Sequence, residues 1–114
     1  MPRLESFSIK IKTGDAGLQD TPKYSINGFP LEFDEATGSV EAGETFEGKG
    51  FPQSFPHTLL LSGPTDGTWD IQGIEATYQC AHFEPYTVRL GAIQLHDNAD
   101  LNLWYEPPPK ALDV

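Results

Sequence analysis

Several aspartates lie in or beside segments of this chain that have turn-forming composition, and carboxylates are ligands that calcium prefers. They are Asp15, Asp20, Asp66, Asp70, Asp97 and Asp100. Loops at one end of a sheet supply the several oxygen ligands that calcium needs. Aspartate also forms turns in its own right, and the chain has no twelve-residue calcium loop of the Asp-x-Asp-x-Asp-Gly type. We therefore expect no resident cofactor, with calcium on Asp15, Asp20, Asp66 and Asp70 as the alternative.

Cys80 and His82 are two positions apart, so a strand would place both side chains on one face. His96 is expected to approach from a neighbouring strand. A zinc site needs three or four such ligands, and a Cys–His nucleophile needs a partner that orients the base. Because the chain has one cysteine and three histidines, we favour a buried structural thiol. An enzyme that uses Cys80 and His82 is the least favoured function.

Aromatic residues form a third set of candidates, because exposed rings can bind sugar rings as carbohydrate-binding modules do. If Leu101, Leu103 and Tyr105 face inward on a last strand, Trp104 faces outward. The alternative is that these rings belong to the core or to a subunit interface. The ligand-binding candidates are Trp69, Trp104, Tyr105, Phe51 and Phe55.

Acidic residues gather between positions 32 and 47, with no basic residue among them. They are Glu32, Asp34, Glu35, Glu41, Glu44 and Glu47. A glycosidase needs two carboxylates that face each other across a cleft, and clustering in sequence does not provide that geometry. We interpret this segment as a solvated acidic face, or as a docking surface for a basic partner.

Strands must position all of these residues, because apolar and polar side chains alternate along the chain. In residues 4–12, Phe7, Ile9 and Ile11 point one way and the polar residues between them point the other, which predicts a half-buried strand. The chain contains 11 glycines and 10 prolines, which leaves little room for long helices. Further strands are expected at residues 23–33, 44–48, 57–62, 69–79, 86–95 and 101–105.

Local signals refine this pattern at four places. Asn27-Gly28 predicts a hairpin turn, which would put Pro30 on a sheet edge or at a bulge. The alternation changes parity at Gly73 and again near Gly91, which indicates β-bulges. Residues 34–42 read as an acidic, turn-like segment.

The sequence therefore predicts an all-β fold. We expect an antiparallel β-sandwich of about seven to eight short strands, with a small β-barrel as the alternative. A chain of 114 residues is expected to form one domain. We place that domain at residues 1–106 and a proline-rich tail at residues 107–114.

Two segments resemble the PLAT (LH2) domain, a β-sandwich. The first is Ile11-Lys12-Thr13-Gly14-Asp15, followed by Gly17 and Asp20; it is similar to the Lys/Arg-Thr-Gly motif that ends the family's first strand. The second, residues 63–69 with Trp69 at its end, resembles the family's acidic, glycine-containing loop before a Trp and a strand. The resemblance implies a non-catalytic module that binds lipid or protein partners, sometimes with calcium.

The formal charge of −10 limits the classes of partner. It repels nucleic-acid phosphates, and it opposes adsorption to anionic membranes unless calcium bridges the two. No apolar run is long enough to span a bilayer, and the N-terminal residues lack a signal peptide's apolar core. A single cysteine suits a reducing compartment, so we expect a cytoplasmic protein.

The function expected from these features is binding without catalysis, through a protein partner or through self-association as a homo-oligomer. The exposed edge strands of a sandwich make self-association reasonable. A calcium-dependent lipid- or carbohydrate-binding module is the alternative.

Overall fold

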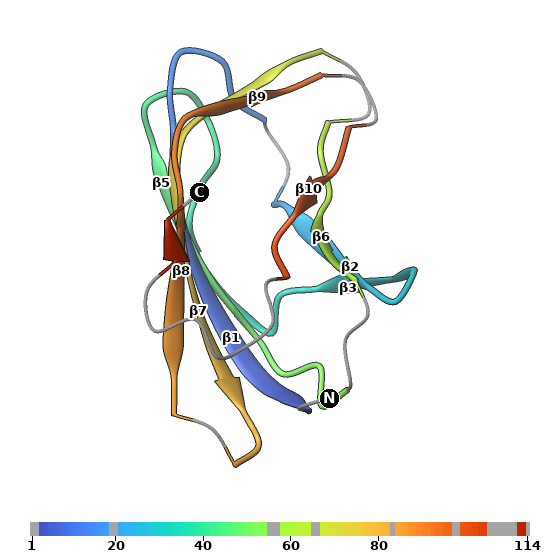
Figure 1. The fold of residues 1–114 in the computed structure, drawn as a ribbon. Helices are drawn as coiled ribbons and strands as arrows, with labels where there is room; N and C mark the ends of the chain where they lie inside the picture. The colour runs from blue at the N-terminus through green and yellow to red at the C-terminus, as the bar shows by residue number, and fades with distance from the viewer. Residues whose placement is uncertain are drawn as a thin grey trace.

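The computed structural model describes residues 3–18, 21–54, 58–64, 67–82, 84–96, 99–104 and 112–113. These residues form strands, turns and loops, and none of them forms a helix that could cross a membrane. The strands build one seven-stranded and one four-stranded sheet. Figure 1 shows the two sheets as separate layers. The predicted all-β, sandwich-like fold is therefore confirmed.

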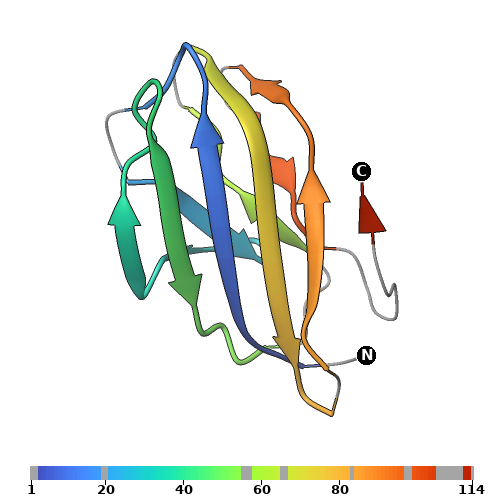
Figure 2. The ribbon, with the colours of Figure 1, turned by 90° about the vertical axis from the view of Figure 1, so that its left-hand side faces the viewer.

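The larger layer has the strand order β11-β8-β7-β1-β5-β4 (Figure 2). Strand β9 pairs with the start of β7, and β8 pairs with the residues of β7 that follow. Neighbours pair antiparallel except β11, which lies parallel to β8. The strands are β1 (Leu4–Thr13), β4 (Glu35–Gly38), β5 (Thr45–Gly50), β7 (Trp69–Cys80), β8 (Tyr86–Leu90), β9 (Ile93–Leu95) and β11 (Leu112–Asp113).

The smaller layer has the order β10-β6-β2-β3. Its strands are β2 (Lys23–Ile26), β3 (Phe29–Glu32), β6 (Leu59–Leu61) and β10 (Leu101–Asn102). The predicted hairpin joins β2 to β3, with Asn27 and Gly28 at φ 52° and 87° as a tight primed turn requires. Pro30 lies on β3 at the edge of this sheet, also as predicted.

The core lies between the layers and combines aliphatic side chains with a cluster of aromatic rings. Phe7 on β1 meets Tyr24 on β2 edge-to-face, with ring centroids 4.9 Å apart. Phe33, which follows β3, packs against both rings and against Phe46 on β5. Because β1, β5 and β7 turn their apolar residues toward this core, their alternate polar residues line the outer face of the large sheet.

The predicted bulge at Gly73 is present. Lys12 pairs with Gly73 while the next residue, Thr13, pairs with Ile71, so Gln72 has no residue opposite it on β1. The second parity change corresponds to a break, because β8 ends at Leu90 and β9 begins at Ile93.

Two local expectations are wrong. The segment expected to be turn-like contains strand β4, whose four residues are all exposed; it buries no face and so shows no alternation. The last strand, expected at residues 101–105, ends at Asn102 among the described residues. Within the expected tail, Leu112–Asp113 pair with Val88 and Arg89.

Candidate binding surface on the outer face of the large sheet

The outer face of the large sheet carries rows of side chains that run across the strands. In one row, Thr37 on β4 pairs with Glu47 on β5, and Glu47 pairs with Lys10 on β1. Lys10 then pairs with Glu75 on β7, and Glu75 pairs with Arg89 on β8. Nε of Arg89 donates to Oε1 of Glu75 at 3.0 Å. From β5 to β8 the charge in this row alternates in sign at every strand.

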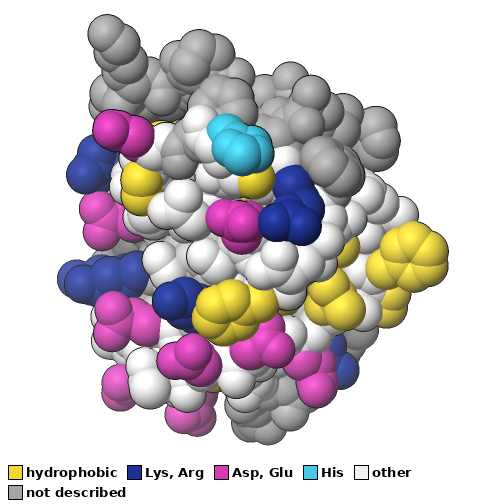
Figure 3. All heavy atoms as spheres, turned by 90° about the horizontal axis from the view of Figure 1, so that it is seen from below, with side chains coloured by type: hydrophobic (Ala, Val, Ile, Leu, Met, Phe, Trp, Pro, Cys, Tyr) yellow, Lys and Arg dark blue, Asp and Glu magenta, His cyan; other side chains and the backbone are white. Residues whose placement is uncertain are grey.

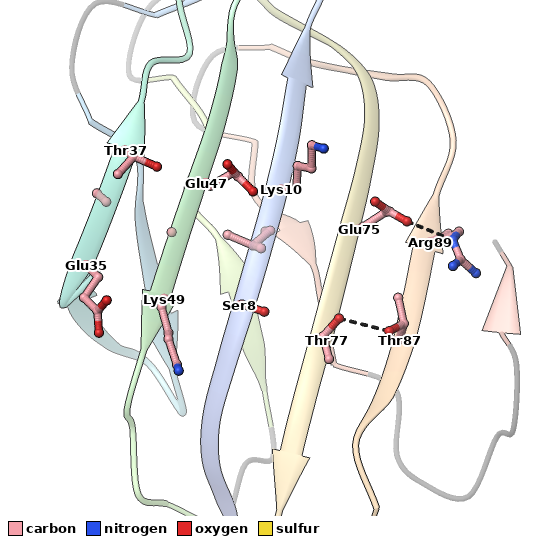
Figure 4. A pocket seen from close by; sticks show the side chains of 13 residues that line it. Ser8, Lys10, Glu35, Thr37, Glu47, Lys49, Glu75, Thr77, Thr87 and Arg89 are labelled. Carbon is pink, nitrogen blue, oxygen red and sulfur yellow. Dashed lines mark hydrogen bonds and ion pairs between the residues drawn. The ribbon is translucent and has the colours of Figure 1, made fainter.

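The neighbouring row is mostly made of hydroxyl groups. Glu35 pairs with Lys49, Lys49 with Ser8, Ser8 with Thr77, and Thr77 with Thr87. The two threonine hydroxyls lie 2.9 Å apart and share a hydrogen bond. Figure 4 shows both rows on the same face, with the Thr77–Thr87 and Glu75–Arg89 contacts dashed.

Together these two rows line a hollow of about 420 Å³ across β4, β5, β1, β7 and β8. We call this surface the outer face and define it by its outward side chains, which are Ser8, Lys10, Lys12, Glu35, Thr37, Glu47, Lys49, Glu75, Thr77, Thr87 and Arg89. A concave surface with many donors and acceptors is suited to a polar ligand.

Positive charge is concentrated on the outer face. Four of the chain's seven Lys and Arg residues lie there, in a protein with a formal charge of −10. Only one ion pair among the described residues belongs to this face, that of Arg89 with Glu75. The ammonium groups of Lys10, Lys12 and Lys49 have no ion-pair partner among the described residues, so they are available to a ligand.

Phe51 is the aromatic candidate that lies beside this surface. It directly follows β5, and its side chain is 42% exposed. The Lys49 ammonium lies 5.1 Å from the centroid of the Phe51 ring. The backbone N–H of Phe51 donates to Oδ2 of Asp34 at 2.9 Å. Phe55 and Tyr105 lie outside the described residues.

Both tryptophans belong to the core, so the expectation that Trp104 faces outward is wrong. Trp104 is 7% exposed and packs edge-to-face on Tyr78, with centroids 5.6 Å apart. Strand alternation stops at Asn102, whose side chain accepts the Trp104 backbone N–H at 3.2 Å. Trp69 is fully buried, and its Nε1 donates to Oγ1 of Thr13. Neither ring offers a face to a sugar.

The aspartate candidates are only partly covered by the described residues. Asp15 and Asp70 lie side by side, because the Asp15 backbone N–H donates to Oδ2 of Asp70 at 3.2 Å and Gly14 donates to the Asp70 carbonyl at 2.7 Å. The described residues contain no group of three acidic, His or Cys side chains that would hold a metal. Asp20 and Asp66 lie outside those residues, so the calcium site stays a prediction.

Cys80 and His82 do not share a face. Strand β7 ends at Cys80, which is buried, and His82 follows in an exposed turn with φ 65°. Burial raises the pKa of the Cys80 thiol; a hydrogen bond with Tyr86 opposes this rise and the charge of Glu5 adds to it. His96 follows β9, which pairs with the opposite end of β7. The three side chains are therefore not brought together.

Hydrophobic side chains are exposed elsewhere, on the β2–β3 hairpin. Phe29 is 70% exposed and Leu31 is 37% exposed. Figure 3, a view from below, shows hydrophobic side chains gathered on the right, the side on which Figure 1 places this hairpin. The outer face lies on the opposite side of the molecule.

The two segments that carry the PLAT resemblance meet at one end of the large sheet. Thr13 from the first segment accepts the indole N–H of Trp69 from the second. The resemblance itself stays a prediction. No protein-family model matches the chain, and no curated protein or solved structure matches it.

Proposed function

We propose that this protein is a non-catalytic binding module that holds a protein partner on the outer face of its large sheet. The observation that carries the proposal is a 420 Å³ hollow lined by hydroxyl, ammonium and carboxylate groups from five strands. A non-catalytic role is also what the PLAT resemblance implies.

The alternating charges of the outer face favour a protein over a uniformly charged polymer. Glu47, Lys10, Glu75 and Arg89 follow one another across four neighbouring strands, which are spaced about 4.8 Å apart. A polypeptide carries charges of both signs and can match such a row, whereas a polyanion meets a repulsive carboxylate at every second position. Like charges placed opposite one another cost several kcal/mol, so this row also rejects partners in the wrong register.

The face is a better docking surface than the edge of the small sheet. An added strand needs unpaired backbone donors, and Pro30 on β3 has no N–H to offer. A second copy of this chain is the other partner that the sequence predicts. Light scattering over a range of concentrations distinguishes a dimer from a complex with a different protein.

A carbohydrate is the second candidate ligand, and Phe51 is the observation that favours it. Its exposed ring lies next to Lys49 at the rim of the hollow. A sugar ring stacks on such a side chain while its hydroxyls bond to neighbouring polar groups.

Capture of partners from the source cells tests the proposal with two matched variants. Ser8→Arg places a long side chain at the centre of the outer face, and Thr58→Arg places one beside the β2–β3 turn. We expect the direct partner, confirmed with purified proteins, to be lost by Ser8→Arg and retained by Thr58→Arg. A direct partner that Ser8→Arg still binds at full affinity contradicts the proposal.

A further inference from the structure

A second hollow of about 280 Å³ lies on the outer face, between the end of β1 and strands β7 and β8. It is lined by the charged residues Lys10, Lys12, Glu75 and Arg89 and by Gly73, Ile74 and Leu90. It shares Lys10, Glu75 and Arg89 with the larger hollow, so one ligand can occupy both. Its volume suits one side chain rather than a whole small molecule.

The hollow exists because Gly73 has no side chain at the bulge. An added Cβ at Gly73 would meet only the Leu90 carbonyl oxygen, at 3.8 Å. Gly73 pairs with Lys12, whose side chain is exposed. One missing side chain, surrounded by charged neighbours, therefore leaves a space that a partner's side chain can fill.

The charges around this space are mostly positive. Lys10, Lys12 and Arg89 bring three positive charges against the single carboxylate of Glu75. Glu75 is already bound by Nε of Arg89, which leaves the two terminal nitrogens of that guanidinium for a ligand. Neither lysine has an ion-pair partner among the described residues. In a chain of formal charge −10, this is a local site for an anion.

We infer that the hollow over Gly73 binds a carboxylate of the protein partner, supplied by an aspartate or glutamate side chain. This inference rests on the proposed function and names the group that the partner contributes. A carboxylate fits the planar fork of Arg89, and the methylene stem that bears it fits the space that Gly73 leaves open. Inorganic phosphate can also pair with these cations, but it has no methylene stem to lie over Gly73.

Two matched peptides test this inference without knowledge of the partner. The probes are N-acetyl-Leu-Glu-Leu-amide and N-acetyl-Leu-Gln-Leu-amide, added to isotope-labelled protein while amide chemical shifts are followed. We expect the glutamate probe to give saturable shifts at Lys12, Gly73 and Leu90. The glutamine probe should bind about tenfold more weakly or worse, because it lacks the charge-assisted hydrogen bonds. Equal binding of the two probes, or no saturable shift at these amides, overturns the inference.

Gly73→Val tests the place of binding. An added Cβ at Gly73 makes only an ordinary van der Waals contact with the backbone, and a β-branched residue is compatible with a strand. We expect Gly73→Val to abolish the shifts caused by the glutamate probe. The control is Gly91→Val, because an added Cβ there meets nothing within 4 Å and Gly91 does not line the hollow. Unchanged binding by a folded Gly73→Val overturns the inference.

Two further ligands identify the source of the anion. Inorganic phosphate and trigalacturonate are titrated in the same way, and we expect both to bind more weakly than the glutamate probe. Tighter binding of either one overturns the assignment to a protein carboxylate. The capture experiment tests the proposed function separately. If the partner binds the outer face but places no carboxylate over Gly73, Ser8→Arg still removes the partner while the glutamate probe fails to bind.

Discussion

The indole Nε1 of Trp69 donates a hydrogen bond of 3.1 Å to Oγ1 of Thr13. Both residues are buried, and Thr13 is the one buried polar side chain of the core among the described residues. The bond joins the end of β1 to the start of β7, directly beside the register shift at the bulge. It therefore holds together the two strands that carry the centre of the outer face.

Thr13→Val replaces this hydroxyl with a methyl group of similar size. The Trp69 N–H then loses its acceptor inside the core, which costs about 1–3 kcal/mol of unfolding free energy. Urea denaturation measures the change. Thr37→Val on exposed strand β4 is the control and should stay within about 0.5 kcal/mol of wild type. Equal stabilities of Thr13→Val and wild type would show that the bond is absent in solution.

Glycine in the β2–β3 turn is required by backbone conformation and not by space. Gly28 has φ +87° and an added Cβ would meet nothing within 4 Å, so Gly28→Ala should cost about 1 kcal/mol through strain alone. Gly91 is equally open but does not have a positive φ in the left-handed region. Gly91→Ala should be neutral or stabilising by up to about 1 kcal/mol. Thermal melts of the two variants compare them directly, and equal losses would contradict the turn geometry.

The strands with a buried face were predictable from their alternation, and the exposed strand β3 was predictable from the Asn27-Gly28 turn before it, but strand β4 was not. Strand β1 alternates buried and exposed residues, which is a period that sequence alone reveals. Strand β4 exposes all four of its residues and, among the described residues, pairs only with β5. Trp104 also escaped prediction, because a cap from Asn102 ends the alternation that would have turned the ring outward.

The stability of the fold should decrease at high pH because of Tyr24. Burial raises the pKa of its phenol, and the charge of Asp34 adds to the rise. The folded state therefore keeps a proton that the unfolded state loses above its ordinary pKa of about 10. The Tyr24 contribution is fully present below that pH and is lost as the pH rises toward the folded-state pKa.

Urea denaturation of wild type and Tyr24→Phe at a series of pH values measures this effect. We expect the difference in unfolding free energy between the two proteins to be constant below about pH 9 and to shift in favour of Tyr24→Phe above about pH 10. Parallel curves over the whole range would show that Tyr24 ionises as easily in the folded state as in the unfolded state.

The Cys80 thiol should react slowly in the native protein. It is fully buried, and burial raises its pKa, so little thiolate is present near neutral pH. With a chromogenic disulfide reagent at pH 8, we expect the native rate to be at least about 100-fold below the rate in urea, because reaction requires opening of the fold. His82→Ala should leave the native rate unchanged. A fast reaction of the native protein that slows in His82→Ala would instead support an enzyme that uses Cys80 and His82.

Only part of the outer face could be predicted from the sequence. The outward residues Ser8, Lys10 and Lys12 follow from the alternation of β1. Their neighbours on β5, β7 and β8 come from segments that are distant in the sequence, and only the strand register brings them together. The aspartates and aromatic rings were more conspicuous as residue types, but Asp70 accepts a hydrogen bond from the Asp15 backbone and Trp69 belongs to the core.

Chemical-shift mapping with the partner selected by the Ser8→Arg comparison tests the central claim most directly. The account predicts that the partner shifts the amides of Ser8, Lys10, Glu47 and Thr77 on the outer face and leaves the β2–β3 hairpin unchanged. Shifts confined to Phe29 and its neighbours in the hairpin, with no shifted amides on the outer face, would contradict this account.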